Sequence, residues 1–379
     1  MARLSRPAIL FAAIGLAGLI LPLVQFRPNR IVPGEGVGLA ALPWGIPIMA
    51  ALGAVLIAAL LPRWPATLRL AMAAIGLTAA VLSLGAAARH LVPESGSLAR
   101  VSPASGFWLL LLAFGLMLAD SINRLRPGLR IRWLMLAGAV GLVAALLVSG
   151  ALDGVSVMRE YATRRDLFAR EARAHLTLAF GSLGLALMVG IPLGIAIYQA
   201  IRWRGAVLGV LNILQTIPSL ALFGIMIPIF GWIAATLPGA AQLGVSGIGT
   251  FPALMALFLY SLLPVVSNTL AGLTGVAPAT RDAAAGLGMT RSQVLAQVLI
   301  PLALPVLLAA VRIVLVQNIG LAVIAGLIGG GGFGTFVFQG LNQTAMDLVL
   351  LGALPTIALA LVAGIALDLL VQGTQRTAR

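Results

Sequence analysis

Long apolar runs alternate with short segments rich in Arg, Gly and Pro along almost the whole chain. One helix needs about 20 predominantly apolar residues to cross a hydrocarbon layer about 30 Å thick. Most of these runs reach that length, so the pattern predicts an all-α polytopic membrane protein. It predicts about ten transmembrane helices, over residues 8–26, 39–61, 66–88, 106–120, 131–151, 174–200, 205–235, 249–275, 300–327 and 346–371.

Composition supports a membrane protein and excludes several kinds of chemistry. The 379 residues are 61% hydrophobic and 9% charged, whereas soluble domains contain about 25% charged residues. All 24 basic residues are Arg, so the chain lacks the Lys that a Walker A loop uses to reach nucleotide phosphates. The chain has no Cys and only two His, far apart in sequence. We therefore expect no disulfide, no metal site and no ATP site.

The Arg residues also predict the topology. With the N-terminus in the cytoplasm, inside segments contain fourteen Arg and outside segments nine, five of which lie in 152–173. The positive-inside rule therefore favours a cytoplasmic location for both termini and for the loop 276–299. This distribution explains the net charge of +14 without nucleic acid as a partner.

The charged segment 152–173 divides the chain. Residues 1–151 contain about five predicted transmembrane helices and no polar constellation, so their role stays open between regulation, lipid contact and a seal around the rest. Charge pairs at helical spacing in 152–173 favour an extracytoplasmic surface helix, with docking of an extracytoplasmic partner as the alternative. Residues 174–371 contain every motif discussed below.

The loop 276–299 is charged and interrupted by glycine. Thr280 is predicted to cap a short helix, with Asp282 in its first turn, and Gly286 and Gly288 are predicted to interrupt that helix. Small residues at 283–285 would make the helix slim enough to enter a groove of a partner protein. A second helix is predicted to begin at a T-x-x-Q capping box, 290–293.

Residues 281–301, RDAAAGLGMTRSQVLAQVLIP, follow the spacing E-A-A-x3-G-x9-I-x-L-P. This spacing resembles the EAA loop of binding-protein-dependent ABC importer permeases, on which a separate ATPase subunit docks. Asp282 replaces the commoner Glu, and Ile300 the commoner Leu. The resemblance implies contact with the ATPase for Asp282, Ala283, Ala284, Gly286, Gly288, Thr290 and Pro301.

Other motifs resemble the osmoprotectant group of these permeases, over about 174–371. They lie at 175–178, 190–194, 215–222, 247–253, 260–264, 268–269, 319–320, 328–334 and 338–341. The resemblance implies a five-helix MetI-like core, and the extra region 1–151 resembles one branch of glycine betaine/choline-type permeases. It implies a multi-pass subunit of the bacterial inner membrane that moves glycine betaine, choline or a similar quaternary amine. The implied partners are an ABC ATPase, an extracytoplasmic solute-binding protein, a second permease copy or sister permease, and membrane lipid.

Three alternatives remain beside this resemblance. The same machine could carry an amino acid or another small polar solute. A passive channel or scaffold would not need the loop 276–299. An intramembrane enzyme using Asp347 or Asp368 with His175 is disfavoured, because the sequence shows no paired carboxylates, metal-spaced His or nucleophile motif. No cofactor is expected in this chain, since ATP would be hydrolysed by the partner.

Polar residues inside the predicted spans either join helices through hydrogen bonds or line a pathway. Asn212, Gln215, Thr216 and Ser219 are predicted to share one helical face, and we place Tyr260, Asn268, Gln317 and Asn318 in the same class of candidates. Arg312 lies well inside a span, where an ionised side chain must pair or face a cavity. The run GGGGFG at 329–334 is expected to form a close helix contact or a re-entrant turn.

Overall fold

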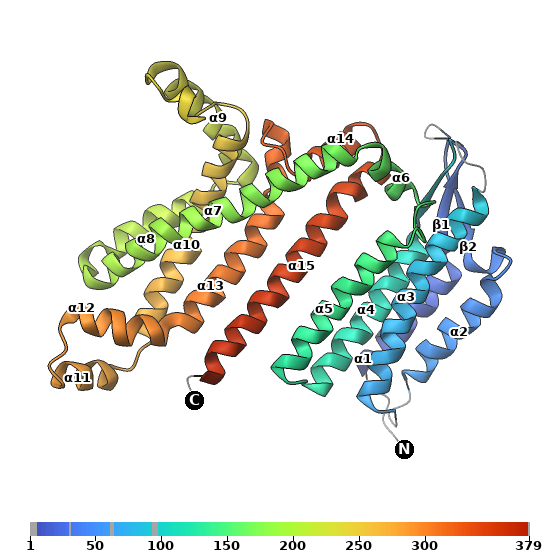
Figure 1. The fold of residues 1–379 in the computed structure, drawn as a ribbon, viewed down its shortest axis with the longest axis horizontal. Helices are drawn as coiled ribbons and strands as arrows, with labels where there is room; N and C mark the ends of the chain where they lie inside the picture. The colour runs from blue at the N-terminus through green and yellow to red at the C-terminus, as the bar shows by residue number, and fades with distance from the viewer. Residues whose placement is uncertain (1–5, 30–31, 61–63, 93–97, 378–379) are drawn as a thin grey trace. The chain divides into compact units, whose positions relative to one another are not determined.

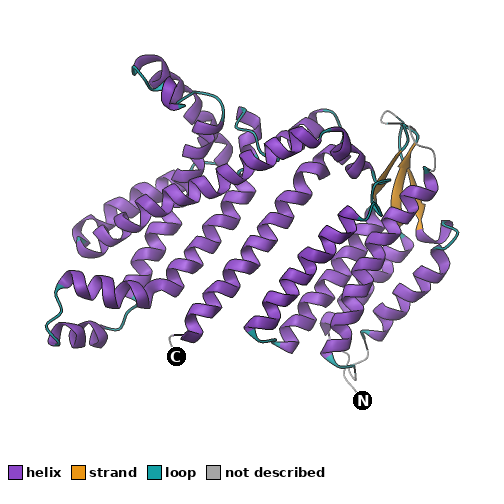
Figure 2. Cartoon of the chain, in the orientation of Figure 1, coloured by secondary structure: helices purple, strands orange, loops and turns teal. Residues whose placement is uncertain are grey.

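The computed structural model describes residues 6–29, 32–60, 64–92 and 98–377. Within these ranges the chain forms two compact units, Met1–Thr163 and Arg164–Arg379, and both are dominated by helices (Figures 1 and 2). The predicted connector 152–173 does not form one separate element. Its first part contains α6 (Ser156–Thr163), and its second part is the beginning of α7 (Arg165–Gln199).

The first unit consists of helices and one small sheet. Its longer helices are α1 (Arg6–Ile20), α2 (Gly45–Ala58), α3 (Ala66–Leu91), α4 (Ser105–Leu125) and α5 (Leu129–Val148). The strands β1 (Pro22–Arg27), β2 (Glu35–Gly38) and β3 (Arg100–Pro103) form an antiparallel sheet in the order β2-β1-β3. The sheet departs from the all-α prediction. It was missed because a short apolar run such as 22–26 fits a strand as well as the end of a helix.

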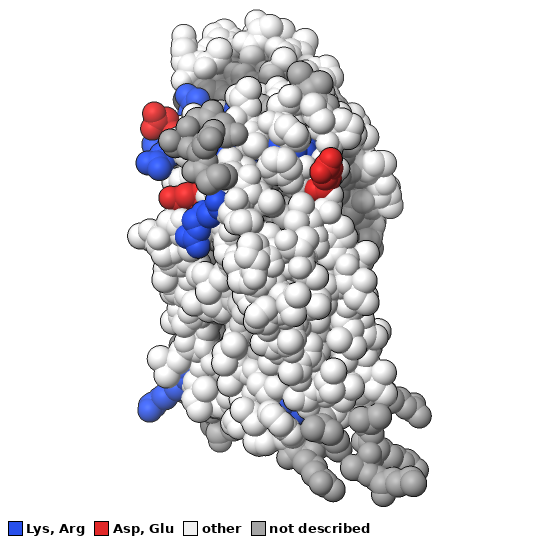
Figure 3. Space-filling view, turned by 90° about the vertical axis from the view of Figure 1, so that its right-hand side faces the viewer, with Lys and Arg blue, Asp and Glu red and all other residues white. Residues whose placement is uncertain are grey.

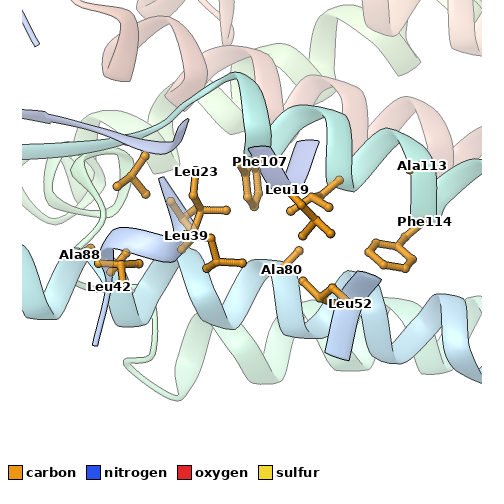
Figure 4. Close-up of a cluster of buried hydrophobic side chains, with 14 of the residues drawn as sticks. Leu19, Leu23, Leu39, Leu42, Leu52, Ala80, Ala88, Phe107, Ala113 and Phe114 are labelled. Carbon is orange, nitrogen blue, oxygen red and sulfur yellow. The ribbon is translucent and has the colours of Figure 1, made fainter. Parts of the chain in front are cut away.

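The core of the first unit lies between α1, α3 and α4 and continues beneath the sheet (Figure 4). Phe114 is fully buried, and a Cβ placed on Gly76 would lie only 2.4 Å from its ring. Gly76 therefore lets α3 approach α4 closely at this aromatic ring. In contrast, α5 contributes no buried residue to the described part of this unit.

The second unit contains the long helices of the predicted core. After α7 follow α8 (Ile201–Thr216), α9 (Ser219–Thr236), α10 (Thr250–Thr274), α11 (Pro278–Gly286), α12 (Arg291–Gln293), α13 (Ile300–Leu321), α14 (Gly334–Asn342) and α15 (Met346–Thr377). α7 packs along α10, and α13 packs against both α10 and α15. The buried side chains of these four helices form the centre of the unit.

The helical polytopic fold is confirmed, but the number of long spans differs from the prediction. Within the described ranges, eight helices are long and apolar enough to cross a membrane. In the predicted spans 8–26 and 39–61 the α-helices are short: α1 has 15 residues and α2 has 14. The predicted span 205–235 is interrupted between α8 and α9.

Charged side chains are distributed as a membrane protein requires. On the face drawn in Figure 3, the described Arg, Asp and Glu side chains lie toward the upper and lower parts, and an uncharged band separates them. Such a band lets an apolar surface face acyl chains while the charged groups remain near water.

Candidate functional site

The first helix of the predicted ATPase-contacting segment begins three residues earlier than a cap at Thr280 would place it. α11 starts at Pro278, with Ala277 as its N-cap residue and no acidic residue in its first turn. Thr280 is therefore not the cap, and Asp282 lies in the middle of the helix. The earlier start follows from proline, whose fixed φ and missing N–H suit the first helical position.

α11 ends in a glycine-dependent turn. Gly288 has φ +82°, and its N–H donates to the Ala285 carbonyl at 3.0 Å, while the Met289 N–H donates to the Ala284 carbonyl at 3.2 Å. This pair of bonds is a Schellman motif, which satisfies carbonyls left free at a helix end. Leu287, inside the turn, is 84% exposed. Such a leucine at the tip of a charged loop is available to a partner protein.

The second helix of the segment begins as predicted. The Thr290 hydroxyl accepts from the Gln293 N–H, and the Gln293 side chain accepts from the Thr290 N–H at 2.7 Å, which completes the capping box. Val294–Leu299 then form a π-helix that leads into α13. Pro301 lacks an N–H for the carbonyl four residues before it, so the wider turn lies where the α-helical bond is missing.

The segment is seated on the ends of α7 and α10. Leu273, Val276 and Leu299 form a buried apolar cluster with partly buried neighbours that include Tyr198. The Arg281 guanidinium donates to the Tyr198 hydroxyl at 3.1 Å. On α11 itself, Ala284 is buried, whereas Asp282 and Ala283 are exposed, as is Gly286. One face of α11 is therefore fixed to the core while the other remains open.

The four polar residues predicted on one helical face do not share one helix. α8 ends at Thr216 and α9 begins at Ser219, so Ile217 and Pro218 form a break between them. The prediction failed because proline at 218 ends the helix instead of kinking a continuous one. Asn212 is exposed and donates to the Leu208 carbonyl within α8 at 2.9 Å.

Gln215 and Tyr260 join this break to a proline kink in α10. The Gln215 amide donates to the Tyr260 carbonyl at 2.8 Å. Pro264 cannot donate to this carbonyl because proline has no N–H. In return, the Tyr260 hydroxyl donates to the Ile217 carbonyl at the break. Two side chains thus satisfy two carbonyls that irregular backbone leaves free inside a membrane helix bundle.

Asn318 connects three helices in the centre of the second unit. Its amide nitrogen donates to the Ser182 hydroxyl at 2.8 Å and to the Ser261 hydroxyl at 2.9 Å, and all three side chains are fully buried. The structure therefore places Asn318 between α7, α10 and α13. Its bonds join helices, which is one of the two alternatives stated for polar residues inside the predicted spans. The partners Ser182 and Ser261 were not singled out in the sequence.

The remaining candidates lie apart from one another. Asn268 is partly buried and donates to the Pro264 carbonyl in its own helix at 2.8 Å. Thr216 is exposed, and its hydroxyl donates to the Ile213 carbonyl of α8. Gln317 and Ser219 are partly buried. Of the eight candidates, Gln215 and Tyr260 are hydrogen-bonded to each other, and this pair lies at the helix break.

Arg312 is paired inside the second unit. Its guanidinium contacts the Asp368 carboxylate of α15, and the other carboxylate oxygen accepts from the Gln372 amide at 2.7 Å. At 1.5 Å per residue, Arg312 lies about 18 Å along the helix from Ile300. An ion pair at this depth joins α13 to α15 and reduces the cost of an intramembrane charge. No group of three or more His, Cys, Asp or Glu side chains that could hold a metal ion occurs among the described residues.

Comparison with known proteins gives matches for both units. Residues 186–376 match the family described as "Binding-protein-dependent transport system inner membrane component". Residues 5–158 match "ABC transporter permease YehY, N-terminal domain".

Among curated relatives, the osmoprotectant import permease protein OsmW of Salmonella typhimurium is 43% identical over 50% of this chain and 82% of its own. The glycine betaine/carnitine/choline transport system permease protein OpuCB of Bacillus subtilis is 37% identical over 50% of this chain and 79% of its own. A solved structure of the MetNI methionine ABC transporter is 24% identical, with a TM-score of 0.48, over 55% of this chain and 96% of that one. The chain therefore belongs to the binding-protein-dependent transport system inner membrane components, the permease subunits of ABC importers, which work with a separate ATPase subunit.

Proposed function

We propose that this chain is the permease subunit of an ABC importer that moves a small osmoprotectant, such as glycine betaine, choline or a similar quaternary amine, into the cytoplasm. The relatives OsmW, an osmoprotectant import permease protein, and OpuCB, a glycine betaine/carnitine/choline permease protein, support this solute class. The structural observation that carries the transport role is the segment 276–299, which is fixed to the core on one face and exposed on the other.

The segment is built to transmit movement. A push on α11 reaches α7 through the bond between Arg281 and Tyr198, and reaches α10 through the cluster around Leu273 and Val276. The π-helix at 294–299 passes the same movement to α13 through a stretch whose backbone is not locked in α-helical bonds. ATP-driven closure of the partner subunits would in this way reorient the helices of the core.

The broken helix pair α8–α9 and the kinked α10 form the candidate wall of the solute pathway. Irregular backbone at membrane depth occurs where protein or a water-filled cavity surrounds it. The bonds of Gln215 and Tyr260 hold the break and the kink next to each other. We assign these two residues to shaping the wall, since their polar groups already serve backbone carbonyls.

The proposal includes the partners and the topology. ATP is bound and hydrolysed by a separate ABC ATPase, and this chain needs no cofactor of its own. An extracytoplasmic binding protein delivers the solute. Each chain carries one segment of the 276–299 type, so a motor with two ATPases requires a second permease copy or a sister permease. Both termini lie in the cytoplasm, as the Arg distribution favours.

A second candidate is the same machine with an amino acid or another small polar solute as cargo. The six Trp residues of the sequence do not suggest an aromatic cage for a quaternary ammonium group, and we expect the delivering protein to determine much of the specificity. Calorimetric titration of that protein with glycine betaine, choline and representative amino acids distinguishes the two solute classes.

The coupling role is tested by deleting residues 282–288. We expect loss of labelled glycine betaine uptake, together with loss of the ATPase from the membrane fraction. Leu287→Glu is the milder variant, because it places a charge at the exposed tip without removing the turn. The control is Leu237→Glu, at an exposed leucine after α9, which should leave ATPase association unchanged. Normal uptake by the deletion variant would rule out the proposed function.

A further inference from the structure

The glycine-rich run 329–334 follows a short 3-10 helix, Ile324–Ile328, leads into α14 and folds against the beginning of α7. Gly329, Gly331 and Gly332 have φ values of +73°, +73° and +87°. Residues with a side chain adopt this left-handed region only at a cost, whereas glycine adopts it readily. The run therefore has a defined and sharply turned conformation that other residue types would not maintain.

Two polar side chains of α7, one helical turn apart, fix this conformation. The Glu171 carboxylate accepts from the Gly332 N–H at 2.7 Å and from the Thr335 hydroxyl at 3.2 Å. His175 Nδ1 accepts from the Phe333 N–H at 3.4 Å. Glu171 is only 8% exposed and His175 is fully buried. The hydrogen bonds from the backbone N–H and the hydroxyl replace part of the hydration that this carboxylate loses on burial, and so they offset part of the cost of burying it.

Aromatic rings close over the same contact. The Phe333 ring centroid lies 4.8 Å from the imidazole of His175 and 5.4 Å from the ring of Phe168. Phe168 also stacks on Phe336 at 6.0 Å. The α7 face that carries Phe168, Glu171 and His175 is thus covered by the run and by the first turn of α14.

On its other side, the run is attached to the residue before α10 and to the short 3-10 helix Ile324–Ile328 that follows α13. The Gly249 N–H, directly before α10, donates to the Ile328 carbonyl at 3.0 Å, and the Gly330 N–H donates to the Ala325 carbonyl at 2.8 Å. These are backbone bonds within and beside the run, whereas the polar bonds to α7 are made by Glu171 and His175. If α7 moves relative to α10, either the Glu171 and His175 bonds break or the run 329–334 moves with α7.

We propose that Glu171 and His175 form a latch that holds the loop 329–334 on α7 and must release when the core opens to the extracytoplasmic side. The inference rests on the proposed importer function, because the topology that places 276–299 in the cytoplasm places this loop on the opposite side. Glu171 is a positioning residue: it acts on the solute route through the loop. A carboxylate with two neutral donors suits a contact that is made and broken, and glycines can absorb the change in φ and ψ.

A reversible cross-link tests whether the latch opens. The chain contains no Cys, so the pair Ala174→Cys and Gly331→Cys has no competing thiol. A Cβ on Gly331 would lie 3.2 Å from the Cβ of Ala174, near the roughly 3.5–4.5 Å found in disulfides. Each single variant is the matched control, and Gly331→Cys alone measures the cost of a side chain at φ +73° with its Cβ 3.0 Å from Glu171 Oε2.

Cells that express the full permease with its ATPase and binding protein are assayed for labelled glycine betaine uptake before and after oxidation. We expect the oxidised pair to import at least about tenfold more slowly than the reduced pair, since a required opening is blocked. Oxidation should not change the uptake rate of either single variant. If mass spectrometry confirms the disulfide and the oxidised pair imports as fast as the reduced pair, the latch does not need to open and the proposal is wrong.

A second measurement does not depend on disulfide formation. Thr335→Cys is labelled from outside with a membrane-impermeant maleimide, with and without Glu171→Ala. We expect labelling about tenfold faster without the carboxylate, because the loop leaves α7 more often, and an intermediate rate with Glu171→Gln. Equal rates in all three would overturn the latch. Absence of import by the unmodified chain would instead reject the proposed function, while the labelling rates still report on the latch.

Discussion

Carbonyl groups that lose their N–H partner explain many of the polar residues in the second unit. Pro264 leaves the Tyr260 carbonyl free, and the break at Pro218 leaves the Ile217 carbonyl without a helical partner. The Gln215 amide donates to the first of these carbonyls and the Tyr260 hydroxyl to the second. A polar side chain near a proline in such a helix is therefore first a candidate for completing the backbone, and only then a candidate for contacting solute.

Asn318 gives a test of this distinction. Asn318→Ala removes the bonds to Ser182 and Ser261, but both serines keep their bonds to the Leu178 and Leu257 carbonyls. We expect a loss of about 1 kcal/mol of stability, as for other hydrogen bonds between membrane helices, and an unchanged KM for the solute. Thermal unfolding in detergent and uptake kinetics measure the two quantities.

The control for this variant is Asn268→Ala, because the Asn268 amide bonds only to a carbonyl of its own helix. Its thermal stability should stay close to that of the unmodified chain. A large rise in KM for Asn318→Ala, without a change in unfolding temperature, would show that Asn318 contacts the solute.

Sequence patterns predicted some residue partners better than others. An ionised Arg inside a span must pair or face a cavity, and Arg312 pairs with Asp368, which lies in the predicted span 346–371. In the sequence, Glu171 is only one of the charges of the segment 152–173. Its role depends on Gly332, far away in sequence, and neither periodicity nor spacing indicates that the fold brings these two residues together.

At the scale of elements, the segment 276–299 shows what local rules determine and what they do not. The capping box at Thr290 and Gln293 was predictable because its partners are three residues apart. The start of α11 was misplaced, since Pro278 is a stronger signal for a first helical position than Thr280 is for a cap. The break in the predicted span 205–235 was missed because proline also occurs inside continuous membrane helices, as Pro228 does in α9.

The turn after α11 gives a matched pair of glycine variants. Gly288→Ala places a Cβ at φ +82°, which should cost the local turn about 1–2 kcal/mol and weaken ATPase association. Gly286→Ala changes a glycine within the helix, with no atom within 4 Å of the added Cβ. It should keep the turn and favour the helix, so association should fall less than with Gly288→Ala.

Co-purification of the tagged permease with its ATPase, followed by uptake, measures both variants. Equal association of the two variants would mean that the Gly288 turn does not present α11 to the ATPase. Because both substitutions add the same methyl group two residues apart, a difference between them reports backbone conformation and not side-chain size.

At the scale of the whole molecule, the permease core and the region before it can be described as separate units. Most of the long helices of both units were predictable because membrane thickness fixes their length. The sheet of the first unit was not, since its pairing joins residues far apart in sequence. The family matches follow the same organisation, with one for residues 5–158 and another for 186–376.

The presence of one segment of the 276–299 type per chain predicts the composition of the transporter. A complex with two ATPase subunits should contain two permease chains, and native mass spectrometry of the purified complex counts them. If the second permease is a copy of this chain, two differently tagged copies co-purify. A complex with one permease chain and two ATPases would contradict the proposed coupling.

The order of the strands has a consequence for biosynthesis. β1 lies in the middle of the sheet, but β3 is encoded after α3, so Arg27 meets Arg100 only when two helices have followed it. At synthesis rates of roughly 5–20 residues per second, β3 emerges about 4–15 s after β1. During this time one edge of β1 remains open to other strands. The first unit is thus exposed to strand mispairing until β3 has been synthesised.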